Sequence, residues 1–137
     1  MIRICILNWN GGDHLKACLE SIQSNSDSNF KVTVIDNNSN DSSLSNLSSN
    51  IELVSLDKNY GFGVGYNLGI NQCLNKDDEY LLLLNYDTIV PNNFIKKIYE
   101  GIDLYGKDYI YGVQILYSSD KEKIWYAGGT VNLSRGL

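Results

Sequence analysis

Short apolar runs alternate along the chain with segments whose apolar residues recur every three or four positions. Four of these runs, at 2–7, 31–36, 51–56 and 79–85, have the length and composition of strands. The last run contains YLLLLN, whose four consecutive leucines predict a strand that is buried on both faces. Two further strands are predicted at 109–117 and 124–133, on either side of a charged turn, SSDKEK.

The segments between the strands carry helical periodicity. Asp13 is expected to cap the first helix, a glycine-rich turn within 59–70 leads into the second, and Pro91 is expected to open the third. The expected apolar faces are Leu15, Cys18, Leu19 and Ile22 on the first helix, Val64, Leu68 and Leu74 on the second, and Phe94, Ile95, Ile98 and Ile102 on the third.

The segment 37–50 is unusual because eleven of its fourteen residues are Asn or Ser. This composition is typical of a flexible linker. Leu44 and Leu47, however, stand three apart after Asp41, a residue that can cap a helix. A linker and a short helix are therefore both open for this segment.

Strands that alternate with helices predict an α/β fold with a mainly parallel sheet and helices on both faces. The 137 residues suggest one domain, over 1–137. Polar clusters follow each of the four strands, as NWNGG, DNNSND, DKNYGFG and NYDT. Because ligands of such sheets bind beyond the carboxyl ends of the strands, these clusters predict a binding site at that edge.

Charge and cysteine content narrow the classes of function. The net charge of −5 argues against nucleic acid as the main partner, and a phosphorylated ligand would need a metal ion or backbone N–H groups. The three cysteines are odd in number and form no C-x-x-C pair, which indicates buried thiols in a reducing compartment. No apolar run has the length of a signal-peptide core or a membrane span, so we expect a cytoplasmic protein.

The glycine-rich segment GFGVGYNLG does not match the dinucleotide-binding fingerprint. Tyr66 or Leu68 stands where the third glycine is required, and the segment follows the third strand, not the first. The glycines allow either a close approach of the backbone to a ligand or tight packing of a helix.

Two acids at strand ends are candidate ligand residues. Asp36 ends the second strand and either accepts hydrogen bonds from a ribose or base, or caps a local turn. Asp87 follows the fourth strand and is a hard oxygen ligand that suits Mg²⁺ or Mn²⁺, with a diphosphate needed to complete the coordination. Alternatively, Asp87 or Thr88 caps the helix after Pro91. His14 is expected to be a solvated residue of the first helix.

Five ordered segments closely resemble the nucleotide-sugar-binding half of family 2 glycosyltransferases, and the nearest group is rhamnosyltransferase-like. They are ILNWNGGDHLKACLESI, VTVIDNNSNDSS, NYGFGVGYNLGI, YLLLLNYDTIVPNNFI and AGGTVNLSRG. The match covers essentially the whole chain, and five segments in order are far more specific than one motif. The resemblance implies a GT-A fold, a Rossmann-like α/β sandwich that binds a nucleoside-diphosphate sugar.

The resemblance also assigns residues to the donor. It places Leu7, Asn8 and Trp9 beside the base, Asp36 on the base or ribose, and Asn59, Gly61, Gly65 and Asn67 beside the ribose and diphosphate. It places Asn85, Tyr86 and Asp87 at the D-x-D motif, with Asp87 as the ligand of Mg²⁺ or Mn²⁺, and Gly128 and Gly129 near the donor sugar. Asn85 departs from the motif, since an acid is usual at its first position.

The implied reaction is inverting transfer of a sugar, with a UDP- or dTDP-sugar as donor and a glycan or lipid-linked saccharide of bacterial surface-polysaccharide assembly as acceptor. The resemblance puts the catalytic base and the acceptor-binding half beyond Leu137, so we expect a fragment that binds donor and transfers poorly alone. Peripheral association with the inner face of the membrane and homodimerisation are open. The alternatives are a non-catalytic nucleotide-sugar-binding module and an unrelated doubly wound enzyme such as a dehydrogenase.

Overall fold

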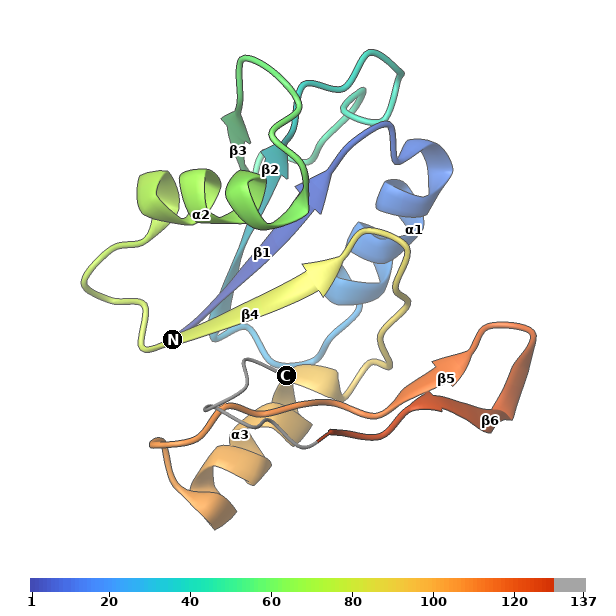
Figure 1. The fold of residues 1–137 in the computed structure, drawn as a ribbon. Coiled ribbons are helices and arrows are strands. Elements are labelled where there is room, and N and C mark those ends of the chain that lie inside the picture. Colours follow the sequence, from blue (N-terminus) through green and yellow to red (C-terminus); the bar gives the residue numbers. More distant parts are fainter. Residues whose placement is uncertain (130–137) are drawn as a thin grey trace. The chain divides into compact units, whose positions relative to one another are not determined.

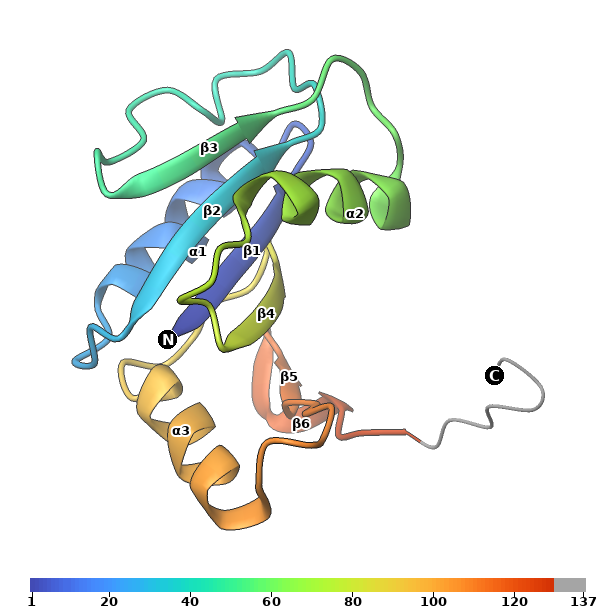
Figure 2. The ribbon, with the colours of Figure 1, turned by 90° about the vertical axis from the view of Figure 1, so that its left-hand side faces the viewer.

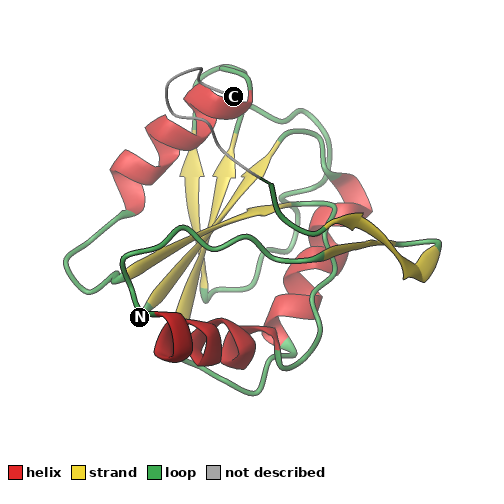
Figure 3. Cartoon of the chain, turned by 60° about the horizontal axis from the view of Figure 1, so that its bottom comes forward, coloured by secondary structure: helices red, strands yellow, loops and turns green. Residues whose placement is uncertain are grey.

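A parallel four-stranded sheet is the centre of the first part of the chain. The computed structural model describes residues 1–129 and orders the strands β3-β2-β1-β4 (Figure 1). All neighbouring strands of this sheet pair in parallel, and Figure 3 shows them as yellow arrows between the helices. The strands are β1 (Ile2–Asn8), β2 (Phe30–Asp36), β3 (Ile51–Ser55) and β4 (Tyr80–Asn85). The predicted mainly parallel α/β sheet is therefore confirmed.

Two helices cover opposite faces of this sheet (Figure 2). Alternate residues of β1 point to opposite sides, so Ile4 and Ile6 pack with Leu15 of α1 (Gly12–Gln23). Cys5 and Leu7 pack on the other side, against α2 (Phe62–Cys73). The first part of α3 (Phe94–Tyr105) adds to the core on the α1 side. Two separate apolar cores thus hold the sheet in place.

The chain divides into two compact units, Met1–Glu100 and Gly101–Leu137. In the second unit β5 (Ile115–Tyr117) and β6 (Asp120–Tyr126) form an antiparallel hairpin with Tyr117 opposite Asp120. The observed strand β5 is therefore shorter than the strand expected at 109–117. The observed β6 begins at Asp120, within the predicted charged turn and earlier than the strand expected at 124–133. Only residues 118 and 119 connect the two strands, and such a short connection allows only antiparallel pairing. Residues 130–133 of the prediction lie outside the described residues, and the single domain over 1–137 stays a prediction.

The starts of two helices differ from the prediction. Gly11 is the N-cap of α1 and Asp13 lies in its first turn, because the Gly12 N–H is already bonded by Asp41 Oδ2 at 3.0 Å. α3 begins at Phe94 and not at Pro91, whose carbonyl accepts the Phe94 N–H at 3.0 Å in a preceding turn. Neither Asp87 nor Thr88 caps this helix, because both lie too far from its first residue.

The buried face of α2 is also different from the expected one. Val64 is 53% exposed, and Leu74 lies beyond the end of the helix and is 44% exposed. The residues that face the sheet are Gly65, Tyr66, Gly69 and Cys73. A face with two glycines lets a helix approach a sheet closely, and this close packing outweighs the burial of the larger apolar side chains.

The four leucines of β4 are not buried on both faces as predicted. Leu84 is buried, whereas Leu81 and Leu83 are 41% and 51% exposed. β4 is an edge strand of the four-stranded sheet, and α2 packs over β1, β2 and β3. The outer leucines therefore lie on the part of that face which α2 does not cover. Within residues 1–129, none of the helices is long and apolar enough to cross a membrane.

Candidate functional site

The register of the sheet brings the polar strand ends together. Asn8 is aligned with Asp36 on β2, and Leu7 is aligned with Asn85 on β4. Leu7 and Asn8 are buried, whereas the side chain of Trp9 is 51% exposed. The predicted convergence of these residues at the carboxyl edge of the sheet is confirmed for β1, β2 and β4.

The amide of Asn8 is the centre of a buried hydrogen-bond network. Its two Nδ2 N–H groups have three acceptors within hydrogen-bond distance, which are Ser43 Oγ at 2.9 Å, Ser39 Oγ at 3.0 Å and Asp36 Oδ1 at 3.3 Å. Its Oδ1 is buried and has no hydrogen-bond partner in the described part of the chain. Gly11 lies directly over this oxygen, since a Cβ added there would be 2.4 Å from it. Three acceptors around Nδ2 set the orientation of the amide, because a flipped amide would point its oxygen at the Asp36 carboxylate.

Asp36 caps a local turn, which is one of the two roles that the sequence left open for it. Ser39 Oγ donates to Asp36 Oδ1 at 2.5 Å, and the Ser39 N–H reaches Oδ2 at 3.2 Å. The carboxylate is 5% exposed. Its Oδ2 accepts only this one bond from the described residues, and a carboxylate oxygen can accept more than one. Contact of Asp36 with a base or ribose therefore stays a prediction.

The Asn- and Ser-rich segment is held by side-chain hydrogen bonds and not by a helix. Residues 43–46 form turns, and Leu44 and Leu47 pack on the α1-side core. Asp41 Oδ1 accepts Ser43 Oγ at 2.5 Å, and Asp41 Oδ2 accepts the Gly12 N–H at 3.0 Å. The Ser43 hydroxyl, followed by the backbone N–H groups of Ser43 and Gly12, lowers the pKa of Asp41. The segment is thus bonded to the start of α1.

Asn37, the first residue of the Asn- and Ser-rich segment 37–50, connects β2 to the glycine-rich segment. Its Nδ2 donates to Asn59 Oδ1 at 2.9 Å and to the Gly61 carbonyl at 3.2 Å, and its Oδ1 accepts the Tyr60 N–H at 2.9 Å. Asn37 is only 2% exposed. Its place directly after Asp36 at a strand end was the one signal in the sequence.

The glycines of this segment have distinct structural roles. Gly61 is the N-cap of α2 with φ +76°, a conformation that side-chain-bearing residues rarely adopt. A Cβ on Gly65 would lie 3.0 Å from Leu7 Cδ1 and 3.2 Å from Asn37 Nδ2, so this glycine lets the helix pack closely on the strand ends. Asn67 is exposed on α2.

The segment after β4 leaves two polar side chains exposed. Asn85 and Asp87 are exposed and Tyr86 is half-buried. The Asn85 backbone carbonyl accepts the Thr88 N–H at 3.3 Å, which closes a turn. Within residues 1–129, the side chains of Asn85 and Asp87 make no hydrogen bond or ion pair with the protein. The Asp87 carboxylate is therefore free for a ligand.

Two buried groups fix the position of this segment. The Tyr66 hydroxyl of α2 donates to the Leu84 carbonyl at 3.0 Å, and burial raises the pKa of Tyr66 to about 12. The Cys18 thiol contacts the Asn85 carbonyl at 3.6 Å. Burial, with a smaller contribution from the Asp87 charge, raises the pKa of Cys18 to about 12. Both groups remain neutral at physiological pH and act as structural contacts.

A divalent metal fits this segment only with help from a ligand. In the part of the chain that the structure describes, no group of three or more His, Cys, Asp or Glu residues could hold a metal ion. Asp87 alone offers an unpaired, exposed carboxylate, and Asn85 offers a neutral amide oxygen. Mg²⁺ in proteins is commonly held by one or two carboxylates together with the phosphates of the substrate, so this donor set fits such an ion.

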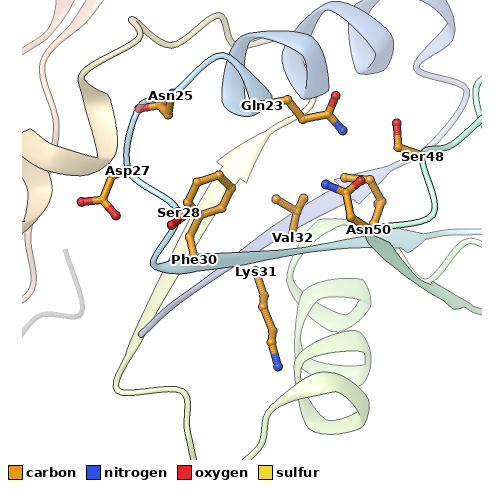
Figure 4. Close-up of a pocket in the computed structure, with 10 residues that line it drawn as sticks. Gln23, Asn25, Asp27, Ser28, Phe30, Lys31, Val32, Ser48 and Asn50 are labelled. Carbon is orange, nitrogen blue, oxygen red and sulfur yellow. The ribbon is translucent and has the colours of Figure 1, made fainter.

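A hollow of the first unit lies at the other end of the sheet. It has a volume of about 540 Å³ and is lined by residues near the starts of β2 and β3, among them Gln23, Phe30 and Asn50 (Figure 4). Lys31, which also lines it, extends toward α2 in this view. The hollow does not include the strand-end residues, so it is separate from the predicted ligand site.

Gly128 and Gly129, predicted near the donor sugar, lie in the second unit. Gly128 has φ +103°, and a Cβ on Gly129 would lie 3.7 Å from the Tyr126 hydroxyl. Their relation to a donor sugar stays a prediction.

The comparison with protein families identifies the family of this chain. The profile described as glycosyl transferase family 2 matches residues 3–135. The chain belongs to glycosyl transferase family 2. The strand-end site of this family 2 chain is therefore the carboxyl edge of a glycosyltransferase fold. No curated protein matched the chain.

Solved structures share the fold of this family 2 chain. The fragment 1–349 of S. aureus TarS has a TM-score of 0.67 and 20% identity, over 76% of this chain and 32% of that fragment. A TarS complex with UDP-GlcNAc has a TM-score of 0.65 and 21% identity, over 76% of this chain and 31% of that one. A mannosyltransferase from Pyrobaculum calidifontis, in complex with GDP-Man and Mn²⁺, has a TM-score of 0.64 and 14% identity. The match covers 74% of this chain and 32% of the mannosyltransferase chain. The chain spans about a third of the length of these neighbours, and the likeness confirms the expected GT-A fold.

Proposed function

We propose that this chain binds the donor of a glycosyltransferase that moves a sugar from a nucleoside-diphosphate sugar to a saccharide acceptor. The observation that carries the proposal is the alignment of Asn8, Asp36 and Asn85 at one edge of the sheet, with the unpaired Asp87 carboxylate directly beyond. Two neighbours of the fold were solved with UDP-GlcNAc and with GDP-Man and Mn²⁺, which supports a nucleoside-diphosphate sugar as ligand.

In this proposal each strand end contacts a different part of the donor. Leu7, Asn8 and Trp9 border the base, and Asp36 accepts a hydrogen bond from the base or ribose through its less occupied Oδ2. The segment with Asn59 and the residues Gly61, Gly65 and Asn67 lie beside the ribose and diphosphate. Gly65 supports this role because its backbone lies close to the strand ends, where an added Cβ would be 3.0 Å from Leu7 Cδ1.

Asp87 would hold the Mg²⁺ or Mn²⁺ ion, with the diphosphate as co-ligand and the Asn85 amide beside it. When bound, the ion neutralises charge on the diphosphate leaving group. Because the protein contributes one carboxylate, we expect weak binding of metal without nucleotide. Asp87 faces no competing cation within the described residues, so its charge is available to the ion.

Transfer itself requires a carboxylate that removes the proton from the acceptor hydroxyl. We propose an inverting reaction in which such a carboxylate acts as the base. Further proposals are a UDP- or dTDP-sugar as donor, rhamnosyl or hexosyl transfer, and a glycan or lipid-linked acceptor of bacterial surface polysaccharide. We also propose a cytoplasmic location.

Thermal unfolding of the purified chain with a nucleotide panel tests the proposal. The panel contains UDP, dTDP, GDP, CMP and NAD, each with and without Mn²⁺. We expect at least one nucleoside diphosphate to raise Tm, because a ligand that binds only the folded state stabilises it, and we expect Mn²⁺ to increase that effect. Stabilisation by NAD alone, or by none of the five, would contradict the proposal.

A further inference from the structure

We propose that Asn37 is a positioning residue that holds the segment 59–61 in the conformation required for the diphosphate of the donor. Asn37 would not touch the donor itself and would act through Asn59 and Gly61. The inference rests on the proposed function, because it assumes that this segment lies beside the ribose and diphosphate.

Within the described residues, all three hydrogen bonds of the Asn37 side chain go to the segment 59–61. The amide has two N–H groups and one carbonyl oxygen. Nδ2 donates to Asn59 Oδ1 at 2.9 Å and to the Gly61 carbonyl at 3.2 Å, while Oδ1 accepts the Tyr60 N–H at 2.9 Å. Three consecutive residues of the segment are thus bonded by one buried side chain.

The backbone of Asn37 connects the same point to the centre of the sheet. The Asn37 N–H donates to the Asn8 carbonyl at 2.8 Å, which continues the pairing of β1 with β2 by one residue. The strand ends and the segment 59–61 therefore share one rigid connection. A displacement of the Asn37 side chain would change the position of the segment relative to Asn8 and Asp36.

The bonds extend from Asn37 to the start of α2. Asn59 Oδ1, which accepts the bond from Asn37, also accepts the Gly61 N–H at 2.8 Å. Gly61 has φ +76° and is the N-cap of the helix. At Gly65, one turn later, an added Cβ would lie 3.2 Å from Asn37 Nδ2, a tighter contact than most. Asn37 thus sets the conformation of the segment and lies under the first turn of the helix that follows.

An amide is the side chain that this position requires. The segment presents an N–H group at Tyr60 and oxygen acceptors at Asn59 and Gly61, so the bonding group must both accept and donate. A carboxylate at 37 would face two oxygen atoms and add a negative charge near the proposed diphosphate. An apolar side chain would leave the buried partners unpaired.

The helix itself has a separate attachment to the sheet. Gly69 packs against Ile35, and Cys73 lies in the same apolar core with its sulfur 3.7 Å from Cys5 Sγ. Loss of the Asn37 bonds should therefore free the segment 59–61 while the rest of α2 stays in place. This separation predicts a local effect on ligand binding that exceeds the effect on global stability.

The test measures binding of two probes by isothermal titration calorimetry, UDP and UMP (or GDP and GMP), in Mn²⁺. Wild type is compared with Asn37→Asp, Asn37→Ser and the matched control Asn71→Ala, an exposed amide on α2. For Asn37→Asp we expect a loss of affinity for the diphosphate of tenfold or more, with less than threefold for the monophosphate. Asn37→Ser, which keeps a donor and an acceptor, should recover part of the loss, and Asn71→Ala should bind as wild type.

The outcomes separate the inference from the proposed function. If wild type binds no nucleoside diphosphate, the proposed function fails first. If wild type binds and Asn37→Asp binds equally well, or loses both probes equally, the positioning role is wrong. Should the variants fail to fold, hydrogen exchange of wild type replaces them. The Tyr60 amide should then be protected at least a hundredfold, and exchange at the random-coil rate would overturn the inference.

Discussion

Gly69 of α2 lies directly against Ile35 of β2, because a Cβ added to the glycine would be 2.4 Å from Ile35 Cγ2. The helix therefore lies closer to the sheet than it could if position 69 carried a side chain. The same approach brings the buried sulfurs of Cys73 and Cys5 to 3.7 Å. The absence of a side chain at Gly69 therefore sets the distance between α2 and the sheet.

Gly69→Ala should destabilise the protein. The added methyl group would meet three carbon atoms of a fully buried side chain, and overpacking of this kind costs about 1–3 kcal/mol. Urea unfolding measures the change. Gly63→Ala is the matched control on the same helix, since no atom lies within 4 Å of its added Cβ. That control should be stabilised by about 0.5–1 kcal/mol, and equal destabilisation of both variants would contradict the close approach.

Arg3→Met should destabilise the protein by about 3 kcal/mol, because it leaves the buried Asp78 carboxylate without its cation. Arg3 Nε donates to Asp78 Oδ2 at 3.1 Å, and both side chains are at most 1% exposed. Burial lowers the pKa of Arg3, but the hydrogen bond and the charge of Asp78 raise it. With a contribution from Glu52, the net effect is a raised pKa for Arg3. The double variant Arg3→Met with Asp78→Asn should recover at least a third of the loss in urea unfolding. No recovery would show that the cost is only lost packing.

The three thiols should not react in the native state. Cys5, Cys18 and Cys73 are all buried, and burial raises the pKa of Cys18 to about 12. At pH 8 roughly one Cys18 side chain in ten thousand would be a thiolate, which is the reactive form. Titration with Ellman's reagent should detect no thiol in buffer and all three in guanidinium chloride. Rapid reaction of one thiol in buffer would contradict its burial.

Acid should release the segment 37–50 from the start of α1. The folded pKa of Asp41 is lowered below its ordinary value of 3.8, so its bonds contribute fully above that value. The contribution is lost as the pH falls through the folded pKa. Amide resonances of Gly12 and Ser43, followed by NMR from pH 6 to pH 2, should shift together with a midpoint below 3.8. In Asp41→Asn this shared shift should be absent, and its persistence would assign the titration to another group.

Asp87→Ala should remove the part of nucleotide binding that depends on Mn²⁺ and leave stability within about 0.5 kcal/mol of wild type, because the exposed carboxylate has no partner in the described residues. Calorimetric titration of UDP or GDP with and without Mn²⁺ measures the difference.

Asn85→Asp should instead tighten Mn²⁺ binding in the absence of nucleotide, since it adds a second carboxylate. Unchanged Mn²⁺ dependence in both variants would exclude this segment as the metal site.

Particular residues show how far sequence reasoning reached. Ile4, Ile6, Leu15 and Ile22 are buried as their periodicity predicted, because one side of a strand or helix must leave water wherever the pattern is this regular. The convergence of Asn8, Asp36 and Asn85 also followed from the sequence, since parallel strands place their carboxyl ends at one edge. The roles of these residues toward a donor stay predictions.

Other features depended on contacts between distant parts of the chain. The N-cap of α1 was misplaced because a carboxylate from residue 41 satisfies its first N–H group, and no local signal contains that bond. The leucines of β4 were misjudged because burial on one face depends on which strands α2 covers. The role of Asn37 in bonding the segment 59–61 has no local signal because its three partners lie more than twenty positions away.

The sequence by itself determined the order of strands and helices, the parallel α/β class and the edge at which polar residues gather, because these depend on local periodicity and on chain connectivity. Only the tertiary structure decided that Asn37 bonds the segment 59–61, that Gly69 allows the close approach to Ile35, and that the Asp87 carboxylate is left unpaired. These features depend on distances of a few ångströms between segments far apart in the chain, and hydrogen bonding and packing act only at that range.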